Sequence, residues 1–87
     1  MLDFTAIDFE TANKYANSAC SLAAVTMNDD RCVKEGYTLI RPPFMVFDPG
    51  NIQIHGITPD QVAHKPKFDA LWDRIRPHLE RRILVAH

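Results

Sequence analysis

Two carboxylates lie two residues apart in the stretch FTAIDFETAN, residues 4–13. Asp8 and Glu10 follow an apolar run, and on a β-strand side chains at i and i+2 point to the same face. Two like charges this close repel unless a cation lies between them. Hard divalent ions such as Mg²⁺ or Mn²⁺ prefer carboxylate oxygens, and Thr11 adds a hydroxyl and a carbonyl. The pair predicts either a metal site or the solvated end of a strand.

The elements that must position this pair begin with an antiparallel sheet. Short apolar runs rich in β-favouring residues predict strands over residues 2–9, 18–27 and 32–42. Residues 11–17 form the first connecting loop. The sequence Asn-Asp-Asp at 28–30 supplies turn chemistry for a hairpin between the second and third strands.

The second half of the chain predicts helices and one further strand. Residues 44–57 are expected to be irregular, with Pro49-Gly50 as a turn. A capping pattern with Thr58 before Pro59 predicts a short helix over residues 58–65. An apolar stripe predicts an amphipathic helix over residues 67–80, which Pro77 should kink or end in its last turn.

The segment RILVA, residues 82–86, reads as a buried strand. After a helix of this length it can lie parallel to the first strand through a right-handed crossover. The order of elements therefore predicts a mixed α/β sheet with a helix on one face. The last strand would form an edge of the sheet that is open to pairing.

Composition fits one small globular domain of 87 residues, with 46% hydrophobic and 24% charged residues. No apolar run approaches the roughly 20 residues needed to span a bilayer, so no membrane partner is expected. The N-terminus has no early Lys or Arg, which argues against a signal peptide and favours a cytoplasmic location. The net charge is −1. The cluster of Arg74, Arg76, Arg81 and Arg82 indicates either a solvated helix face or a weak attraction for phosphates.

The two cysteines are predicted not to form a disulfide. In the expected hairpin Cys20 lies opposite about position 39 and Cys32 opposite about position 27, so they are separated by about 23 Å along the ladder. Bridged Cα atoms lie within about 7 Å of each other. Both are expected to be free, buried thiols, and their spacing matches no zinc pattern.

Three segments resemble the DEDD exonucleases, the DnaQ-like family of the ribonuclease H-like fold. AIDFETAN resembles the first motif of this family, NIQIHGIT resembles its I-H-G-I-T segment, and ILVAH resembles the start of its second motif. The three occur in the family's order at fitting separations. The chain is most similar to bacterial proteins like the exonuclease domain of the DNA polymerase III epsilon subunit. The resemblance implies that residues 1–87 are the N-terminal half of an exonuclease domain, incomplete at the C-terminus.

The resemblance also implies a chemistry. Members of the family remove nucleotides from the 3′ ends of DNA or RNA with two divalent ions roughly 3.5–4 Å apart, one activating water and one stabilising the leaving oxygen. Asp8 and Glu10 would be the catalytic metal ligands for Mg²⁺ or Mn²⁺. Phe9 and Thr11 would line the terminal nucleotide, and Ile54 and His55 would contact its base or sugar. His55 alternatively has a structural role as a donor to a loop carbonyl.

The chain departs from the family pattern because it supplies two of the four carboxylates and no residue that can be named as the general base. Asp60, Asp69 and Asp73 belong to helix surfaces. We expect a truncated portion that is inactive alone, or a chain that exchanges strands with a partner to complete the site. The alternative is a non-catalytic module that forms homodimers or larger oligomers through the RILVA edge. A single-stranded DNA or RNA 3′ end and a DNA polymerase are the expected partners, and the sequence does not discriminate DNA from RNA.

Overall fold

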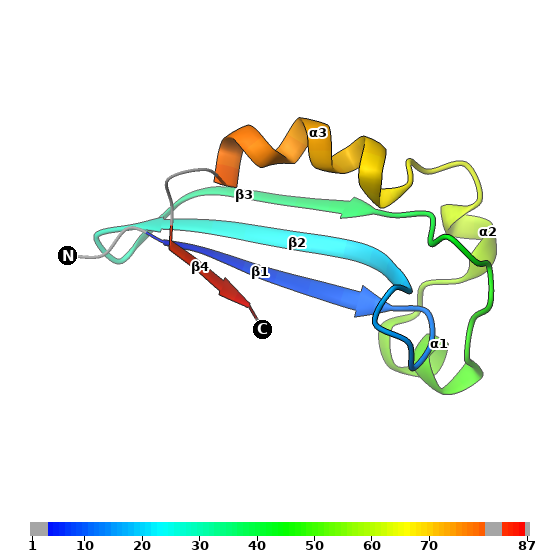
Figure 1. Ribbon diagram of the computed structural model, residues 1–87. Coiled ribbons are helices and arrows are strands. Elements are labelled where there is room, and N and C mark those ends of the chain that lie inside the picture. Colours follow the sequence, from blue (N-terminus) through cyan, green and yellow to red (C-terminus); the bar gives the residue numbers. More distant parts are fainter. Residues whose placement is uncertain (1–3, 80–82, 87) are drawn as a thin grey trace.

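A computed structural model describes residues 4–79 and 83–86 as one four-stranded sheet with three helices. The strands lie side by side in the order β3-β2-β1-β4, and helix α3 covers one face of the sheet (Figure 1). In chain order the elements are β1 (Phe4–Thr11), β2 (Ala19–Asn28), β3 (Arg31–Leu39), α1 (Pro49–His55), α2 (Pro59–Val62), α3 (Phe68–Leu79) and β4 (Ile83–Ala86). Within these residues no helix has the length and apolar content needed to cross a bilayer.

The sheet is mixed, as the sequence predicts. β1 pairs antiparallel with β2, β2 pairs antiparallel with β3, and β4 lies parallel to β1 with Phe4 opposite Ile83. The β2–β3 turn places Asp29 and Asp30 at positive φ values of 51° and 66°. Asp tolerates this left-handed conformation better than most residues, which confirms the predicted turn.

Helix α3 packs on the sheet through the apolar stripe that the sequence predicts. Leu71 is buried together with Leu22 of β2 and with Ile40, which follows β3. Ile7 of β1 and Ile75 of α3 pack against this cluster. The helix continues through Pro77 as far as Leu79, and residues 80–82 lie outside the described part of the chain.

The prediction that residues 44–57 are irregular is wrong for residues 49–55, which form helix α1. The side chain of Asp48 caps the helix by accepting a hydrogen bond of 2.8 Å from the Gly50 N–H, and Pro49 occupies the first turn. Gly56 ends it in a left-handed conformation, with φ of 75°, and donates to the Ile52 carbonyl. Helix α2 is shorter than predicted.

A second core lies where the loop after β1 meets α1 and α2. Ala12, Cys20, Ile57 and Val62 are buried in it. Both cysteines are free, and Cys32 lies opposite Met27 as predicted. The expectation that both thiols are buried is wrong for Cys32, because β3 is an outer strand whose residues 31–37 are all exposed.

Candidate active site at the end of strand β1

The alternation of β1 separates its side chains between the two faces of the sheet. Thr5 and Ile7 line a hollow beneath α3, and the Phe9 ring lies 6.0 Å from the ring of Phe68 on that helix. Because neighbouring strand residues point to opposite faces, Asp8 and Glu10 project together from the face away from α3. Asp8 is exposed and Glu10 is half-buried. The fold therefore brings the two predicted carboxylates to one face of the sheet.

A β-bulge interrupts the β1–β2 ladder at the end of the acidic pair. Glu10 lies opposite Ser21 and Thr11 opposite Ala19, so Cys20 is an extra residue on β2. Bulges bend a strand and redirect the groups beside them, and they are frequent next to active sites. This one frees the end of β1 from regular pairing with β2.

The Thr11 carbonyl is held by two side chains of helix α1. Asn51 Nδ2 donates to this oxygen at 3.0 Å, and His55 Nε2 lies 3.0 Å from it. Asn51 and His55 are four residues apart, so they share one face of the helix. Together they fix the residue that follows the acidic pair.

Hydrogen bonds assign the tautomer of His55. Its Nδ1 accepts a hydrogen bond of 2.9 Å from the Ile57 N–H, so the proton of the neutral ring is on Nε2, which donates to Thr11. The Cys20 Sγ lies 3.9 Å from the same Nε2. His55 therefore has the structural contact that the sequence allowed as the alternative to a substrate contact.

The loop after β1 is ordered by its own polar side chains. The Asn13 side chain accepts from the Tyr15 N–H at 2.9 Å and donates to the Val46 carbonyl at 2.7 Å. The Ser18 hydroxyl donates within the same loop, and the Asp48 N–H donates to the Ala12 carbonyl at 2.8 Å. These bonds join the loop to the segment that leads into α1.

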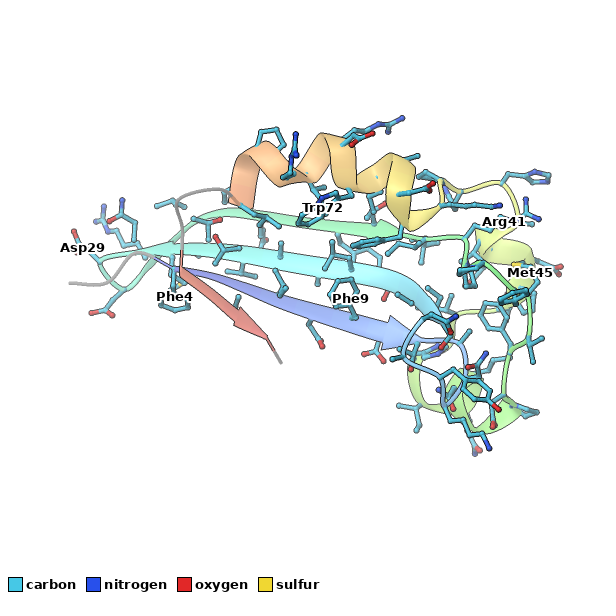
Figure 2. All side chains as sticks on the ribbon, in the orientation of Figure 1. Phe4, Phe9, Asp29, Arg41, Met45 and Trp72 are labelled. Carbon is cyan, nitrogen blue, oxygen red and sulfur yellow. The ribbon has the colours of Figure 1, made fainter. Side chains whose placement is uncertain are left out.

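Two of the four predicted substrate residues, Phe9 and Thr11, lie on the opposite face of the sheet from the carboxylates. Phe9 and Thr11 line a hollow of about 360 Å³ that also includes Arg41 and Phe68, on the α3 side of the sheet. Ile54 is 84% exposed on α1. Figure 2 places Arg41 at the end of the molecule that carries α1 and α2, and Asp29 at the opposite tip. The substrate roles of Phe9, Thr11, Ile54 and His55 stay predictions.

Electrostatic coupling reaches from the acidic pair into the second core. Burial raises the pKa of the Cys20 thiol, and the negative charge of Glu10 raises it further. Both effects disfavour the thiolate. Cys20 is consequently a neutral side chain of the core, which also contacts His55.

The donor set of Asp8 and Glu10 fits a hard divalent ion, because both offer carboxylate oxygens from one face of a strand. Among the described residues, no group of three His, Cys, Asp or Glu side chains lies close enough to hold a metal ion. Asp60, Asp69 and Asp73 are exposed on α2 and α3, as predicted. The pair is therefore a partial ligand set.

Asn51 and Asn13 were not predicted as parts of the site. For Asn51 a signal exists in the sequence. Asp48-Pro49 is a favoured helix start and His55-Gly56 a favoured helix end, so α1 can be located from its caps. Asn51 and His55 then fall on one helix face.

Solved structures with the same fold span more than this chain does. The structure described as "Exonuclease X in complex with 5′ overhanging duplex DNA" superposes with a TM-score of 0.80 at 30% identity, over 97% of this chain and 48% of that one. The nuclease domain of 3′hExo, a DEDDh family member bound to rAMP, gives 0.78 at 18% identity over 97% and 50%. The zinc-bound E. coli ExoI–ssDNA complex gives 0.81 at 19% identity over 100% and 20%. The chain spans about half the length of the first two.

The family is decided by the sequence as a whole. No curated protein gave a significant match. The family model RNase_T, described as an exonuclease family, matches residues 5–87, which is nearly the entire chain. The match includes the acidic pair, helix α1 and strand β4, and it confirms the predicted family and its ribonuclease H-like fold. The chain therefore belongs to the RNase T-like, DnaQ-like DEDD family of 3′–5′ exonucleases.

Proposed function

We propose that this chain provides the first two metal-binding carboxylates, Asp8 and Glu10, of a 3′–5′ exonuclease site. The observation that carries the proposal is their common face at the end of β1, beside a bulge and a strand end held by α1. Family membership supports the same chemistry. Mg²⁺ or Mn²⁺ bound there would supply an activated water and charge stabilisation at the leaving oxygen.

The other residues of the site have positioning and binding roles in this proposal. Asn51 and His55 fix the Thr11 carbonyl, so the backbone that carries Glu10 keeps its direction. Ile54, 84% exposed on the same helix, offers an apolar surface to the terminal base. Phe9 packs on Phe68, so its contribution to nucleotide binding would be through the α3 side of the sheet.

The substrate we propose is the 3′ end of a single-stranded nucleic acid. Structures of similar fold hold duplex DNA with a 5′ overhang, single-stranded DNA, or rAMP. All of these ligands contain nucleotides with a sugar, a phosphate and a base, and stacking and phosphate contacts bind such groups without reading a sequence. A DNA polymerase partner and a cytoplasmic location stay predictions.

We further propose that the 87-residue chain is inactive alone. Asp8 and Glu10 are half of the carboxylates that the family chemistry requires. The described part of the chain offers no third ligand beside them. Two carboxylates should bind metal weakly, and the sequence offers no residue that can be named as the general base.

The test is Mn²⁺ binding followed by electron paramagnetic resonance, with a nuclease assay on a labelled single-stranded oligonucleotide. We expect weak Mn²⁺ binding that Asp8→Ala reduces about tenfold, because one of two charged ligands is lost. Asp29→Ala, at the far hairpin tip, is the matched control and should bind like the wild type. No variant should release nucleotides.

Two results would count against these proposals. Equal Mn²⁺ affinity in Asp8→Ala and the wild type would show that the ion does not bind at Asp8 on β1. Nucleotide release by mass-verified wild-type chain, absent in Asp8→Ala, would show that a second chain completes the site and that the chain is active in that form.

A second candidate function is a non-catalytic module that oligomerises. The observation in its favour is that β4 lies at the end of the strand order β3-β2-β1-β4 among the described residues. Such a strand presents unpaired backbone groups on its outer side.

A further inference from the structure

A hollow of about 190 Å³ lies beside the loop that follows β1, apart from the carboxylate face. It is lined by Asn13, Tyr15, Asn17, Ser18, Phe44 and Val46. Its three apolar side chains are unusually open to solvent: Tyr15 is 63% exposed, Phe44 69% and Val46 64%. Exposed apolar groups that gather around one hollow mark a binding surface more often than chance.

The walls of this hollow are held in place. Asn13 bonds to Tyr15 on one side and to the Val46 carbonyl on the other, so one side chain ties the two walls together. The Ser18 hydroxyl donates to the carbonyls of Asn13 and Tyr15. A binding surface whose groups are already ordered loses less entropy when a ligand arrives.

The charge around the hollow favours an anionic ligand with flat apolar groups. Lys14 Nζ lies over one face of the Tyr15 ring, 5.5 Å from its centroid, which places a cation beside the aromatic surface and leaves the other face of the ring for stacking. None of the six lining residues that the structure describes is acidic. A volume below the range of about 300–1,000 Å³ typical of drug-sized ligands fits one ring system at a time.

The hollow is joined to the end of β1 by short hydrogen bonds. The Asp48 N–H bonds the Ala12 carbonyl, and the Ala12 N–H bonds the Ser18 carbonyl, both at 2.8 Å. Ala12 follows Thr11 directly. The loop that lines the hollow is therefore continuous with the strand that carries Asp8 and Glu10, and hydrogen bonds fix its start.

We propose that Tyr15 and Phe44 form a base-stacking subsite for single-stranded nucleic acid, with Lys14 at a neighbouring phosphate. The subsite rests on the proposed exonuclease function and extends it, because it assigns binding to nucleotides beyond the terminal one. Stacking on aromatic rings tolerates any base, since every base has a π face. The subsite therefore selects unpaired strands without reading their sequence.

The experiment measures fluorescence anisotropy of a labelled oligothymidylate in EDTA, so that no metal contributes. An abasic oligonucleotide of equal length carries the same phosphates without bases. We expect the double variant Tyr15→Ala/Phe44→Ala to bind oligothymidylate about tenfold more weakly. Its affinity for the abasic strand should be unchanged. Tyr37→Ala removes an aromatic ring that is 65% exposed on β3, and this matched control should bind like the wild type.

Several outcomes overturn the subsite. They are unchanged affinity in the double variant, equal loss for both oligonucleotides, or no binding by the wild-type chain. A change of oligomeric size in the double variant without a change in oligonucleotide affinity would assign the surface to a second copy of the chain. Circular dichroism checks that the exposed substitutions leave the fold intact.

The test separates this subsite from the exonuclease proposal. Asp8→Ala should bind Mn²⁺ about tenfold more weakly, and its affinity for oligothymidylate in EDTA should not fall, because the substitution removes a negative charge. If Mn²⁺ binds at Asp8 and the double variant binds oligothymidylate normally, only the subsite is wrong. If Asp8→Ala binds Mn²⁺ as the wild type does and the double variant loses affinity for oligothymidylate, only the proposed metal site is wrong.

Discussion

His55 uses both ring nitrogens inside the fold. One accepts from the Ile57 N–H and the other donates to the Thr11 carbonyl. A neutral imidazole has one donor and one acceptor, so no polar group of the ring is left for a strong new hydrogen bond. Any contact of His55 with a nucleotide would consequently use the ring face or edge rather than an additional hydrogen bond.

The two cysteines should react very differently. Burial and the charge of Glu10 raise the pKa of the Cys20 thiol, whereas Cys32 is exposed. The thiolate is the reactive form, so iodoacetamide at pH 8 should alkylate Cys32 at least tenfold faster than Cys20. Peptide mass spectrometry after timed quenching measures both rates in one sample.

The free energy of unfolding should depend on the ionisation of the Cys20 thiol. The folded chain holds the Cys20 proton more tightly than the unfolded chain, so the free energy of unfolding falls as pH rises above the ordinary thiol pKa of about 8.5.

Glu10→Gln, which removes the charge and keeps the shape, should speed alkylation of Cys20 alone. Equal rates for the two thiols would contradict the described burial.

Helix α1 depends on its caps, since seven residues are too few for a helix that is stable by itself. Asp48→Ala removes the acceptor of the Gly50 N–H and should lower the free energy of unfolding by about 1 kcal/mol. Urea titration followed by circular dichroism measures the change.

The matched control for this prediction is Asp48→Asn. Its amide oxygen can still accept from the Gly50 N–H, and Asn caps helices about as well as Asp, so most of the stability should return. A loss as large as that of Asp48→Ala would mean that the charge of Asp48, and not the cap, stabilises α1.

The elements found from the sequence are those with a periodic pattern. Short apolar runs rich in β-favouring residues located the strands, and the stripe through Leu71 and Ile75 located α3. Helix α1 has no such stripe, because Ile54 is 84% exposed and no residue of the helix is buried. It is defined by its caps, Asp48 and Gly56, whereas the sequence analysis interpreted Pro49-Gly50 as a turn.

The candidate site also has one part that a local sequence pattern predicts and another part that no such pattern predicts. One strand rule places Asp8 and Glu10 on a common face, so the pair could be predicted. The contacts of Asn51 and His55 with Thr11 join residues 40 and 44 positions apart. Such pairs depend on how α1 docks against β1, and no local pattern contains that information.

At the scale of the whole molecule, the length of β4 bears on whether the chain forms oligomers, which is the second candidate function. The strand has four residues and pairs with β1 over all four. Short edge strands resist edge-to-edge pairing, so we expect a chain at micromolar concentration to sediment as a monomer. Sedimentation velocity over a range of concentrations measures this. A stable dimer would contradict this expectation and would support pairing through the β4 edge.

The clamp on the Thr11 carbonyl also has a consequence for the order of folding. The β2–β3 hairpin closes across a tight turn, whereas the bonds from Asn51 and His55 close loops of 40 and 44 residues. Each doubling of loop length adds about 0.6 kcal/mol to the entropy cost of closure. The hairpin can therefore act as an early folding nucleus, and the acidic pair gains its fixed surroundings only in the final steps. Asp8 and Glu10 precede the hairpin in the sequence, yet their surroundings are completed after the hairpin has formed.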